Sequence, residues 1–141
     1  MCDTSCNAHR NEETSAFTAN YVEGSGKPLI FSRVELNVGN DYNTSTGVFT
    51  CRVPGIYYFM VSLEKQRDAT HDYVVAIMLI KGTNTLYSHV WVNDAGYHML
   101  GVSGTFHMKR GDTASISSSP ASYFRYDGGA FTGFLIRPDY V

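Results

Sequence analysis

The side chains best suited to binding chemistry gather in three segments of the sequence, residues 66–72, 93–98 and 118–130. All three carry planar hydrogen-bonding groups, and two of them also carry tyrosine. A tyrosine ring can cover the apolar C–H patches of a sugar, while carboxylate, amide and guanidinium groups pair with its hydroxyls. This combination favours a carbohydrate ligand. The candidate ligand-binding residues are Arg67, Asp94, Tyr97, His98, Tyr123, Arg125, Tyr126 and Asp127.

The alternative interpretation is that these are ordinary solvated loops, with Tyr123 or Tyr126 partly packed against the core. Catalysis is not expected from the same residues. The five histidines are scattered, and neither a Gly-x-Ser-x-Gly nor a His-Glu-x-x-His motif occurs. No nucleophile stands at an informative spacing from a base, so we predict that the protein is not an enzyme and assign no catalytic residue.

Short runs typical of β-strands separate these segments. From Ala16 onward, alternating or β-branched runs are bounded by clusters of Gly, Asn, Asp, Ser and Pro, as in an all-β sandwich. The predicted strands cover residues 16–21, 28–37, 47–52, 55–66, 72–82, 85–93, 97–109, 112–118 and 130–137. Consecutive strands of an antiparallel sandwich mostly run in opposite directions, so the three segments should share one end. Tight turns at 82–84 and 109–111 should lie at the other end.

The predicted strand that follows Pro54 is apolar on both faces. Alternation places Tyr57 and Phe59 on one face, and Tyr58 and Met60 on the other. A strand at the surface of a monomer has one wet face, so a second apolar face predicts contact with another subunit. The sequence alone does not rank the two faces. The residues assigned to the core or to the subunit interface are Tyr57, Tyr58, Phe59, Met60, Phe131 and Phe134.

A set of aromatic residues, with one asparagine and one glycine, stands at fixed spacing around this strand: Phe31, Asn37, Tyr42, Phe49, Gly55, Tyr57 and Phe59. The spacing resembles the signature of the C1q globular domain. Val61 departs from it, because the family pattern has Phe or Tyr at that position. Residues 16–19, 46–49, 111–112 and 131–139 resemble the family's opening strand, pre-core turn, late hairpin and closing strand, so the resemblance covers about 16–139.

The resemblance implies an all-β fold, an antiparallel jelly-roll β-sandwich similar to tumour necrosis factor, assembled as a homotrimer. It also implies a lectin-like pattern-recognition protein of innate immunity that binds carbohydrate or microbial surface ligands. The alternative is a cytokine-like or structural trimer that binds a protein receptor. Some family members bind calcium near the trimer axis. Asp94 is the only acidic residue in the matching region, and calcium needs six to eight oxygens, so we expect no cofactor and keep calcium at Asp94 as the weaker alternative.

Length and composition limit the remaining possibilities. A chain of 141 residues fits one domain, and we divide it into a flexible polar arm, 1–15, and a C1q-like globular domain, 16–141. The net charge of −2 without clustered Lys or Arg argues against nucleic acid as a partner. No apolar run approaches the ~20 residues that a membrane-spanning helix needs, so no membrane span is expected.

The cysteines divide into two groups. Cys2 and Cys6 lie in the polar arm and should be exposed or bridged, whereas Cys51 lies in the approach to the core and should be a buried free thiol. Composition and resemblance favour a secreted, extracellular protein. The first residues show neither the basic start nor the apolar core of a secretory signal, so a cytosolic location stays open as an alternative.

Overall fold

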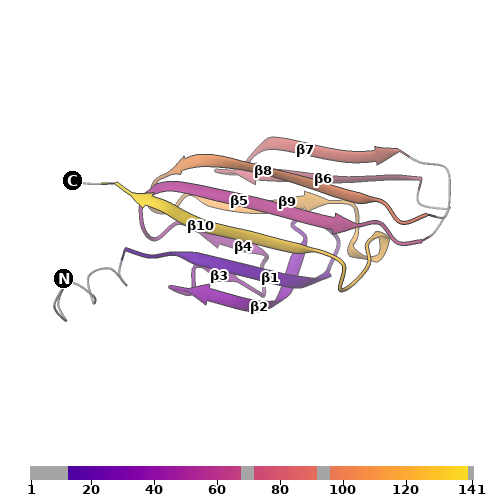
Figure 1. The fold of residues 1–141 in the computed structure, drawn as a ribbon, viewed down its shortest axis with the longest axis horizontal. Coiled ribbons are helices and arrows are strands. Elements are labelled where there is room, and N and C mark those ends of the chain that lie inside the picture. The colour runs from indigo at the N-terminus through magenta and orange to yellow at the C-terminus, as the bar shows by residue number, and fades with distance from the viewer. Residues whose placement is uncertain (1–12, 68–71, 92–95, 140–141) are drawn as a thin grey trace.

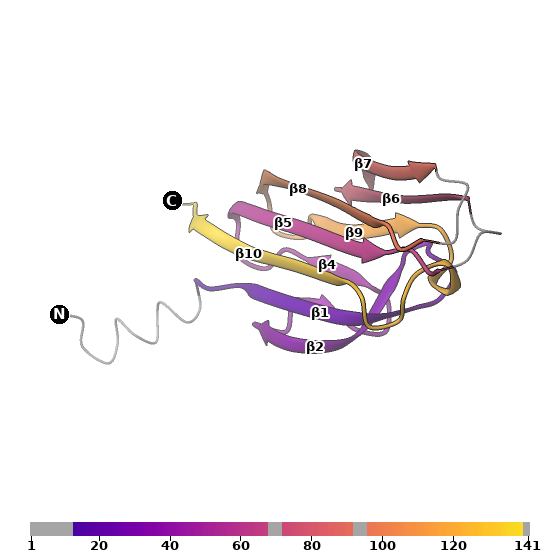
Figure 2. The same ribbon diagram turned by 45° about the vertical axis from the view of Figure 1, so that its right-hand side comes forward.

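Two antiparallel sheets packed face to face form the fold in the computed structural model, which describes residues 13–67, 72–91 and 96–139 (Figure 1). One five-stranded sheet has the order β2-β1-β10-β5-β8 and is called the β5 sheet here; the other has the order β3-β4-β9-β6-β7 and is called the β6 sheet. Figures 1 and 2 show the β5 sheet in front of the β6 sheet. The predicted all-β antiparallel sandwich is confirmed. The strands are β1 (Ala16–Glu23), β2 (Ile30–Val38), β3 (Tyr42–Asn43), β4 (Val48–Thr50), β5 (Gly55–Glu64), β6 (Tyr73–Ile80), β7 (Thr83–Trp91), β8 (Met99–Met108), β9 (Thr113–Ser118) and β10 (Ala130–Pro138).

Each predicted strand is present, and the sequence reading missed two short elements. The first is β3, whose two residues are too few to show alternation. The second is the 3-10 helix η1 (Ala121–Tyr123), which follows Pro120 in the connection between β9 and β10. Short turns of this kind depend on local hydrogen bonds rather than on hydrophobic periodicity, so a pattern-based reading has little to detect.

Stacked aromatic rings fill the space between the sheets. The ring centroid of Phe17 lies 4.9 Å from that of Tyr42 and 5.4 Å from that of Phe49. The Phe131 ring meets the Phe17 ring edge-on at 5.0 Å. Pairs in these geometries contribute roughly 0.5–1.5 kcal/mol each beyond the apolar area they bury. Tyr42 and Phe49, two of the aromatic residues at fixed spacing in the sequence, therefore lie in the core together with Phe17 and Phe131.

Gly133 lets β10 pass over this cluster. A Cβ atom at this position would collide with the rings of Phe17 and Phe59. Only glycine allows the backbone to approach the rings so closely, so any side chain here would have to displace the core.

The structure ranks the two apolar faces of β5, which the sequence could not do. Tyr57 and Phe59 are fully buried between the sheets. Met60 is 38% exposed and Tyr58 is half-buried, and both lie on the opposite side of the strand, facing away from the β6 sheet. One face of β5 therefore makes the core of the single chain, and the other stays uncovered in it.

A polar cluster secures the start of β1. Ser15 Oγ donates a hydrogen bond to Asp41 Oδ2 at 2.6 Å, and Arg52 Nε lies 3.0 Å from Asp41 Oδ1. Arg52 Nη2 also donates to the Thr14 carbonyl oxygen at 2.7 Å. Ser15, which the sequence reading assigned to the arm, is buried. Residues 1–12 of the predicted arm, including Cys2 and Cys6, lie outside the described residues.

Cys51 is buried and free, as expected. Its thiol donates to the Val53 carbonyl oxygen at 3.2 Å. Burial raises the pKa of the Cys51 thiol, which keeps the sulfur protonated and poorly nucleophilic. Its role is therefore structural.

We predict that the domain loses stability as the pH rises above 10. Burial of the hydroxyl raises the pKa of Tyr42 to about 12 from its ordinary 10.0, and a backbone hydrogen bond with Phe31 partly opposes the rise. The hydroxyl accepts from Phe31 N–H at 3.1 Å and donates to Phe31 C=O at 3.2 Å. Tyrosine in the unfolded chain ionises first, so Tyr42 contributes its stability fully below pH 10 and loses it as the pH approaches 12. The loss should reach roughly 2–3 kcal/mol.

Urea unfolding at pH 8, 10 and 11.5 measures this change. Tyr42→Phe should be less stable at pH 8, because its two hydrogen bonds are gone, but should show a shallower decline with pH. Burial also raises the pKa of Tyr57, so part of the decline should persist in the variant. A free energy of unfolding that stays level between pH 8 and pH 11.5 would contradict the prediction.

Candidate ligand-binding site

Four strands of the sandwich end at the same end of the molecule. There β1, β5, β7 and β9 finish and β2, β6, β8 and β10 begin, on the right in Figures 1 and 2. Because consecutive strands run in opposite directions, the sequence predicted that the connections after β5, β7 and β9 would share one end. The connection between β1 and β2, residues 24–29, shares the same end and was not included. We call this region the loop end.

Main-chain hydrogen bonds tie the connections of the loop end to one another. Lys65 N–H donates to the His98 carbonyl oxygen at 2.8 Å, which joins the end of β5 to the start of β8. Arg125 N–H donates to the Glu64 carbonyl oxygen at 2.7 Å, which joins β5 to the connection before β10. The exposed side chains in this region are therefore carried by a braced backbone.

Two guanidinium groups flank the ring of Tyr97. The Cζ atom of Arg67 lies 6.0 Å from the ring centroid, and that of Arg125 lies 5.9 Å from it. Arg125 Nε is 3.0 Å from Asp127 Oδ1, and its Nη1 is 3.9 Å from Glu64 Oε1. The hydrogen bond to Asp127 raises the pKa of Arg125 above its already high ordinary value, so the guanidinium stays charged. Carboxylate and guanidinium groups thus stand beside an exposed ring.

A second group of stacked side chains continues from this one. The Tyr126 ring stacks on the Tyr21 ring with centroids 4.8 Å apart. The guanidinium of Arg33 lies 4.9 Å from the Tyr21 centroid and donates to the Tyr21 hydroxyl at 2.8 Å. Arg33 Nε is 2.8 Å from Glu35 Oε2. Rings and charged groups therefore alternate here as well.

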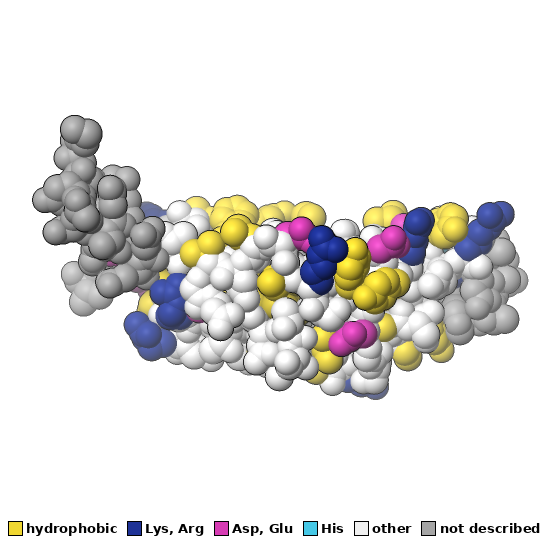
Figure 3. All heavy atoms as spheres, turned by 90° about the horizontal axis from the view of Figure 1, so that it is seen from below, with side chains coloured by type: hydrophobic (Ala, Val, Ile, Leu, Met, Phe, Trp, Pro, Cys, Tyr) yellow, Lys and Arg dark blue, Asp and Glu magenta, His cyan; other side chains and the backbone are white. Residues whose placement is uncertain are grey.

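The two groups are neighbours, since Tyr126 stands between Arg125 and Asp127 in the chain. Figure 3 looks at the molecule from this side and shows hydrophobic, basic and acidic side chains alternating across its right half. We call the two groups together the loop-end row: Arg67, Tyr97, Arg125, Asp127, Tyr126, Tyr21, Arg33 and Glu35.

Tyr21 has a backbone conformation that bulky residues rarely adopt. Its φ is +62°, in the left-handed region, where a residue with a Cβ carries a cost of roughly 1–2 kcal/mol. The pairing of β1 with β2 also shifts register between Thr18 and Ala19, as at a β-bulge. Strained residues persist where the surroundings determine their conformation, and they cluster at binding sites. The strain at Tyr21 therefore supports a functional role for the row.

The structure brings together five of the eight predicted site residues, namely Arg67, Tyr97, Arg125, Tyr126 and Asp127. His98 and Tyr123 are half-buried, and Tyr123 packs against the core, so neither belongs to the exposed row. Asp94 lies outside the described residues, so its role stays a prediction.

Sequence reasoning missed Tyr21, Arg33 and Glu35. Tyr21 is the last residue of the strand predicted at 16–21. Because consecutive strands run in opposite directions, the connection that follows this strand should lie at the loop end. The sequence therefore places Tyr21 beside the loop end, although the predicted site contained only residues from the later connections.

The described residues contain no group of three or more His, Cys, Asp or Glu side chains that could hold a metal ion. Calcium binding through Asp94 stays untested. None of the helices in the described part of the chain is long and apolar enough to cross a membrane.

The uncovered face of the β5 sheet is apolar over several strands. The Phe134 ring on β10 lies 5.5 Å from the Tyr58 ring on β5. Phe134 is 42% exposed, and Ile136 is 52% exposed. Tyr58, Met60 and Phe134 from the predicted core-or-interface set thus lie on this face, whereas Tyr57, Phe59 and Phe131 are in the core. Extended apolar patches of this kind mark interaction surfaces.

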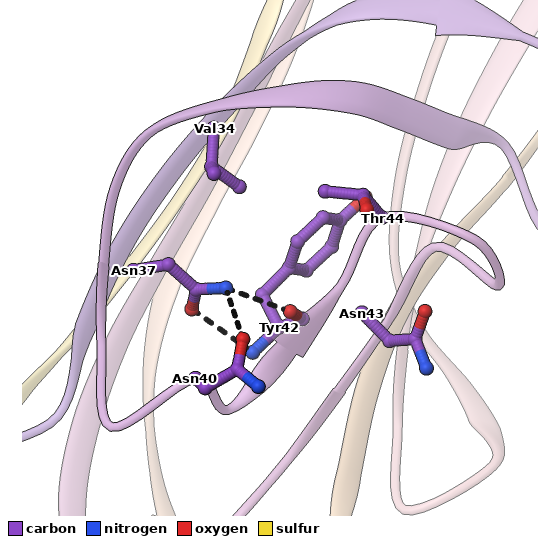
Figure 4. Close-up of a pocket in the computed structure, with 6 residues that line it drawn as sticks. All are labelled: Val34, Asn37, Asn40, Tyr42, Asn43 and Thr44. Carbon is purple, nitrogen blue, oxygen red and sulfur yellow. Dashed lines mark hydrogen bonds between the residues drawn. The ribbon is translucent and has the colours of Figure 1, made fainter.

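A polar pocket of about 320 Å³ lies between β2 and β3, lined by Val34, Asn37, Asn40, Tyr42, Asn43 and Thr44 (Figure 4). The Asn37 side chain accepts from Tyr42 N–H at 3.2 Å and donates to the Tyr42 carbonyl oxygen at 2.9 Å. It also donates to Asn40 Oδ1 at 3.3 Å. The Asn37 amide therefore holds the turn in place, and we assign it a structural role.

Comparison with known proteins agrees with the fold and identifies the family. The two sheets around an aromatic core define the class of jelly-roll β-sandwiches. Within that class, the family model of the C1q domain matches residues 13–136, so the chain belongs to the C1q domain family.

Two different subunits of the complement C1q subcomponent of Rattus norvegicus are among the similar relatives. One is 32% identical over 118 residues, which are 80% of this chain and 47% of the relative. The other is 30% identical over 125 residues, which are 86% of this chain and 48% of the relative. The chain thus spans about half the length of these curated relatives.

Solved structures show the same fold at low sequence identity. The globular domain of zebrafish complement 1qA protein superimposes with a TM-score of 0.73 at 19% identity, covering 89% of this chain and 99% of the other. Murine APRIL at pH 5.0 superimposes with a TM-score of 0.71 at 11% identity, covering 87% and 99%.

We predict that the Tyr21→Gly variant has a higher free energy of unfolding than the Tyr21→Ala variant. Both variants lose the ring, but alanine keeps the strain of the left-handed backbone and glycine removes it, a difference of ~1 kcal/mol. Chemical denaturation of the two variants measures this difference. An alanine variant as stable as the glycine variant, or more stable, would show that residue 21 does not hold this conformation.

Proposed function

We propose that this chain is the recognition domain of a secreted pattern-recognition protein that binds carbohydrate on microbial or cell surfaces. The observation that carries the proposal is the loop-end row, an exposed line of tyrosine rings interleaved with guanidinium and carboxylate groups. Tyr97 is 52% and Tyr126 54% exposed, so their rings are open to a ligand. Membership of the C1q domain family supports a binding role, and no catalytic role is proposed.

The chemistry of the row fits a sugar. The exposed face of Tyr126 would cover the C–H face of a pyranose ring, as aromatic rings cover apolar patches. Asp127 and Arg125 already form a hydrogen-bonded pair, and both retain lone pairs or N–H groups for ligand hydroxyls. Stacking supplies affinity in this arrangement, and the polar groups select hydroxyl orientation.

The proposed assembly is a homotrimer that buries the uncovered face of the β5 sheet. This face carries Tyr58, Met60, Phe134 and Ile136. Three rows on one rigid particle would engage a repetitive surface together, so that weak single sites give strong overall binding.

The second candidate function is binding of a protein receptor. The mixture of tyrosine and arginine in the loop-end row is also typical of the residues that dominate protein interfaces. A glycan array distinguishes the two candidates, because a receptor-binding domain would leave every glycan unbound.

We predict that Met60→Asp converts the trimer to folded monomers. The aspartate would lie unpaired in the buried interface, at a cost of several kcal/mol. Because Met60 faces away from the core, the monomer should keep its fold. Light scattering after size-exclusion chromatography measures the mass, with Asn84→Asp on exposed β7 as the control that stays trimeric. A monomeric wild-type chain at micromolar concentration would contradict the assembly.

We predict that Tyr126→Ala and Asp127→Ala each weaken binding to glycan-coated surfaces while the trimer stays folded. Loss of a stacking ring or of one well-placed polar partner should cost ~1–3 kcal/mol per site, and multivalency multiplies the loss. Glycan-array binding with and without calcium measures the effect. Lys109→Ala, at the opposite end of the sandwich, is the control and should bind normally.

Two results would count against this site. Full binding by both row variants together with weakened binding by Lys109→Ala would move the site to the other end. Absence of any glycan binding by the wild-type chain would favour the receptor alternative.

A further inference from the structure

A second group of exposed rings lies on the other side of the sandwich, on the outer face of the β6 sheet. Trp91 is 74% exposed and Tyr87 59% exposed, and His89 between them on β7 is exposed as well. Tyr73 on β6 meets the Trp91 ring at 5.1 Å and the His89 ring at 6.0 Å. We call these four residues the β7 stripe. It shares no residue with the loop-end row.

The strand register shows what lies beside the stripe. Tyr73 stands opposite Trp91, and Ile77 opposite Tyr87. On its other side Ile77 stands opposite Ser117 of β9. A ligand on this face would therefore meet rings on β7, aliphatic side chains on β6 and hydroxyl groups on β9.

The face is uncharged along its strands. The sequences of β6, β7 and β9 contain no Asp, Glu, Lys or Arg. Charged side chains stand at its borders, such as Lys27, Asp72 and Lys81. Edge strands of soluble proteins are commonly protected by charge, especially lysine, and β7 is an edge strand that has none. An exposed, uncharged and aromatic edge is typical of a surface that binds a ligand or another molecule.

A pocket of about 360 Å³ adjoins the same face, lined by Lys27, Pro28, Val48, Leu79, Ser115 and Ser117. Leu79 stands opposite Ser115, so the pocket opens onto the β6–β9 pair, beside the strand that carries the stripe. The pocket would give an extended ligand a second point of contact on this face.

We propose that the outer face of the β6 sheet is a second glycan site, which binds a neutral polysaccharide chain along the β7 stripe. The three strands themselves offer no ionic partner to an acidic or basic ligand, and Lys27 is the one charged residue among those that line the adjoining pocket. Rings with polar edges beside serine hydroxyls match the alternating C–H faces and hydroxyls of a neutral sugar chain. From Tyr87 to Trp91 the strand spans about 13 Å, which suits several linked sugars better than a single one.

This site rests on the proposed function only in that the protein binds glycans. It needs neither the loop-end row nor the trimer. The two sites would differ in ligand charge: the row offers guanidinium and carboxylate groups, and the stripe offers none.

Trp91 is the only tryptophan of the chain and therefore reports on this face directly. The experiment measures acrylamide quenching of its fluorescence in the trimer, with and without a soluble neutral β-glucan, mannan or galactan, and with alginate as the anionic probe. At least one neutral polysaccharide should lower the quenching constant about twofold and shift the emission to the blue, whereas alginate should not. Tyr87→Ala should weaken this response about tenfold, and Tyr126→Ala should leave it unchanged.

Each of the other possible results would contradict the proposal of a second site, and each would do so for a different reason. Neutral glycan binding that leaves Trp91 quenching unchanged would place the ligand elsewhere and leave the proposed function standing. No response and no binding to any glycan would remove both proposals. An equal response to alginate would contradict the neutral specificity. An emission shift that follows protein concentration without glycan would show that a second copy of the chain covers the stripe.

Discussion

The structure depends on one strand, β5, that is apolar on both faces. Its inward side chains, Tyr57 and Phe59, join the stacked rings that hold the two sheets together. Its outward side chains, Tyr58 and Met60, have no such cover in the single chain. Because period-two alternation fixes both sets at once, the strand cannot satisfy its core without presenting an apolar surface on the other side. In the proposed trimer, folding and assembly would therefore be linked through the same ten residues of β5.

The same strand also positions the candidate binding site. At its end, Glu64 accepts a main-chain hydrogen bond from Arg125 and lies near the Arg125 guanidinium. The connection before β10 is thereby fastened to the strand that anchors the core. The charged row at this end and the uncharged stripe on the outer face lie on different parts of the sandwich. One small domain can thus present two kinds of binding surface.

The sequence predicted the features that follow from periodicity, and it failed where periodicity carries no information. Alternation located the strands, and the aromatic residues at fixed spacing identified the family. Ranking the faces of β5 failed because Tyr58 and Met60 are as apolar as their inward neighbours. The sequence places Tyr21 beside the loop end, but its contacts with Tyr126 and Arg33 depend on a left-handed backbone that periodicity does not show. Arg33 and Glu35 join the row only through Tyr21 and one another, so they were missed with it.

Hydroxyl-radical footprinting read by mass spectrometry tests the central claim most directly, because it compares both sides of the sandwich in one sample. The account predicts that Met60 and Phe134 are protected in the native protein and that Tyr87 and Trp91 are modified readily. In the single chain Met60 is 38% exposed and Phe134 is 42% exposed, so their protection would require cover from another copy. Modification of Met60 and Phe134 at rates that match these exposures would contradict the account, because β5 would then keep an apolar face in water.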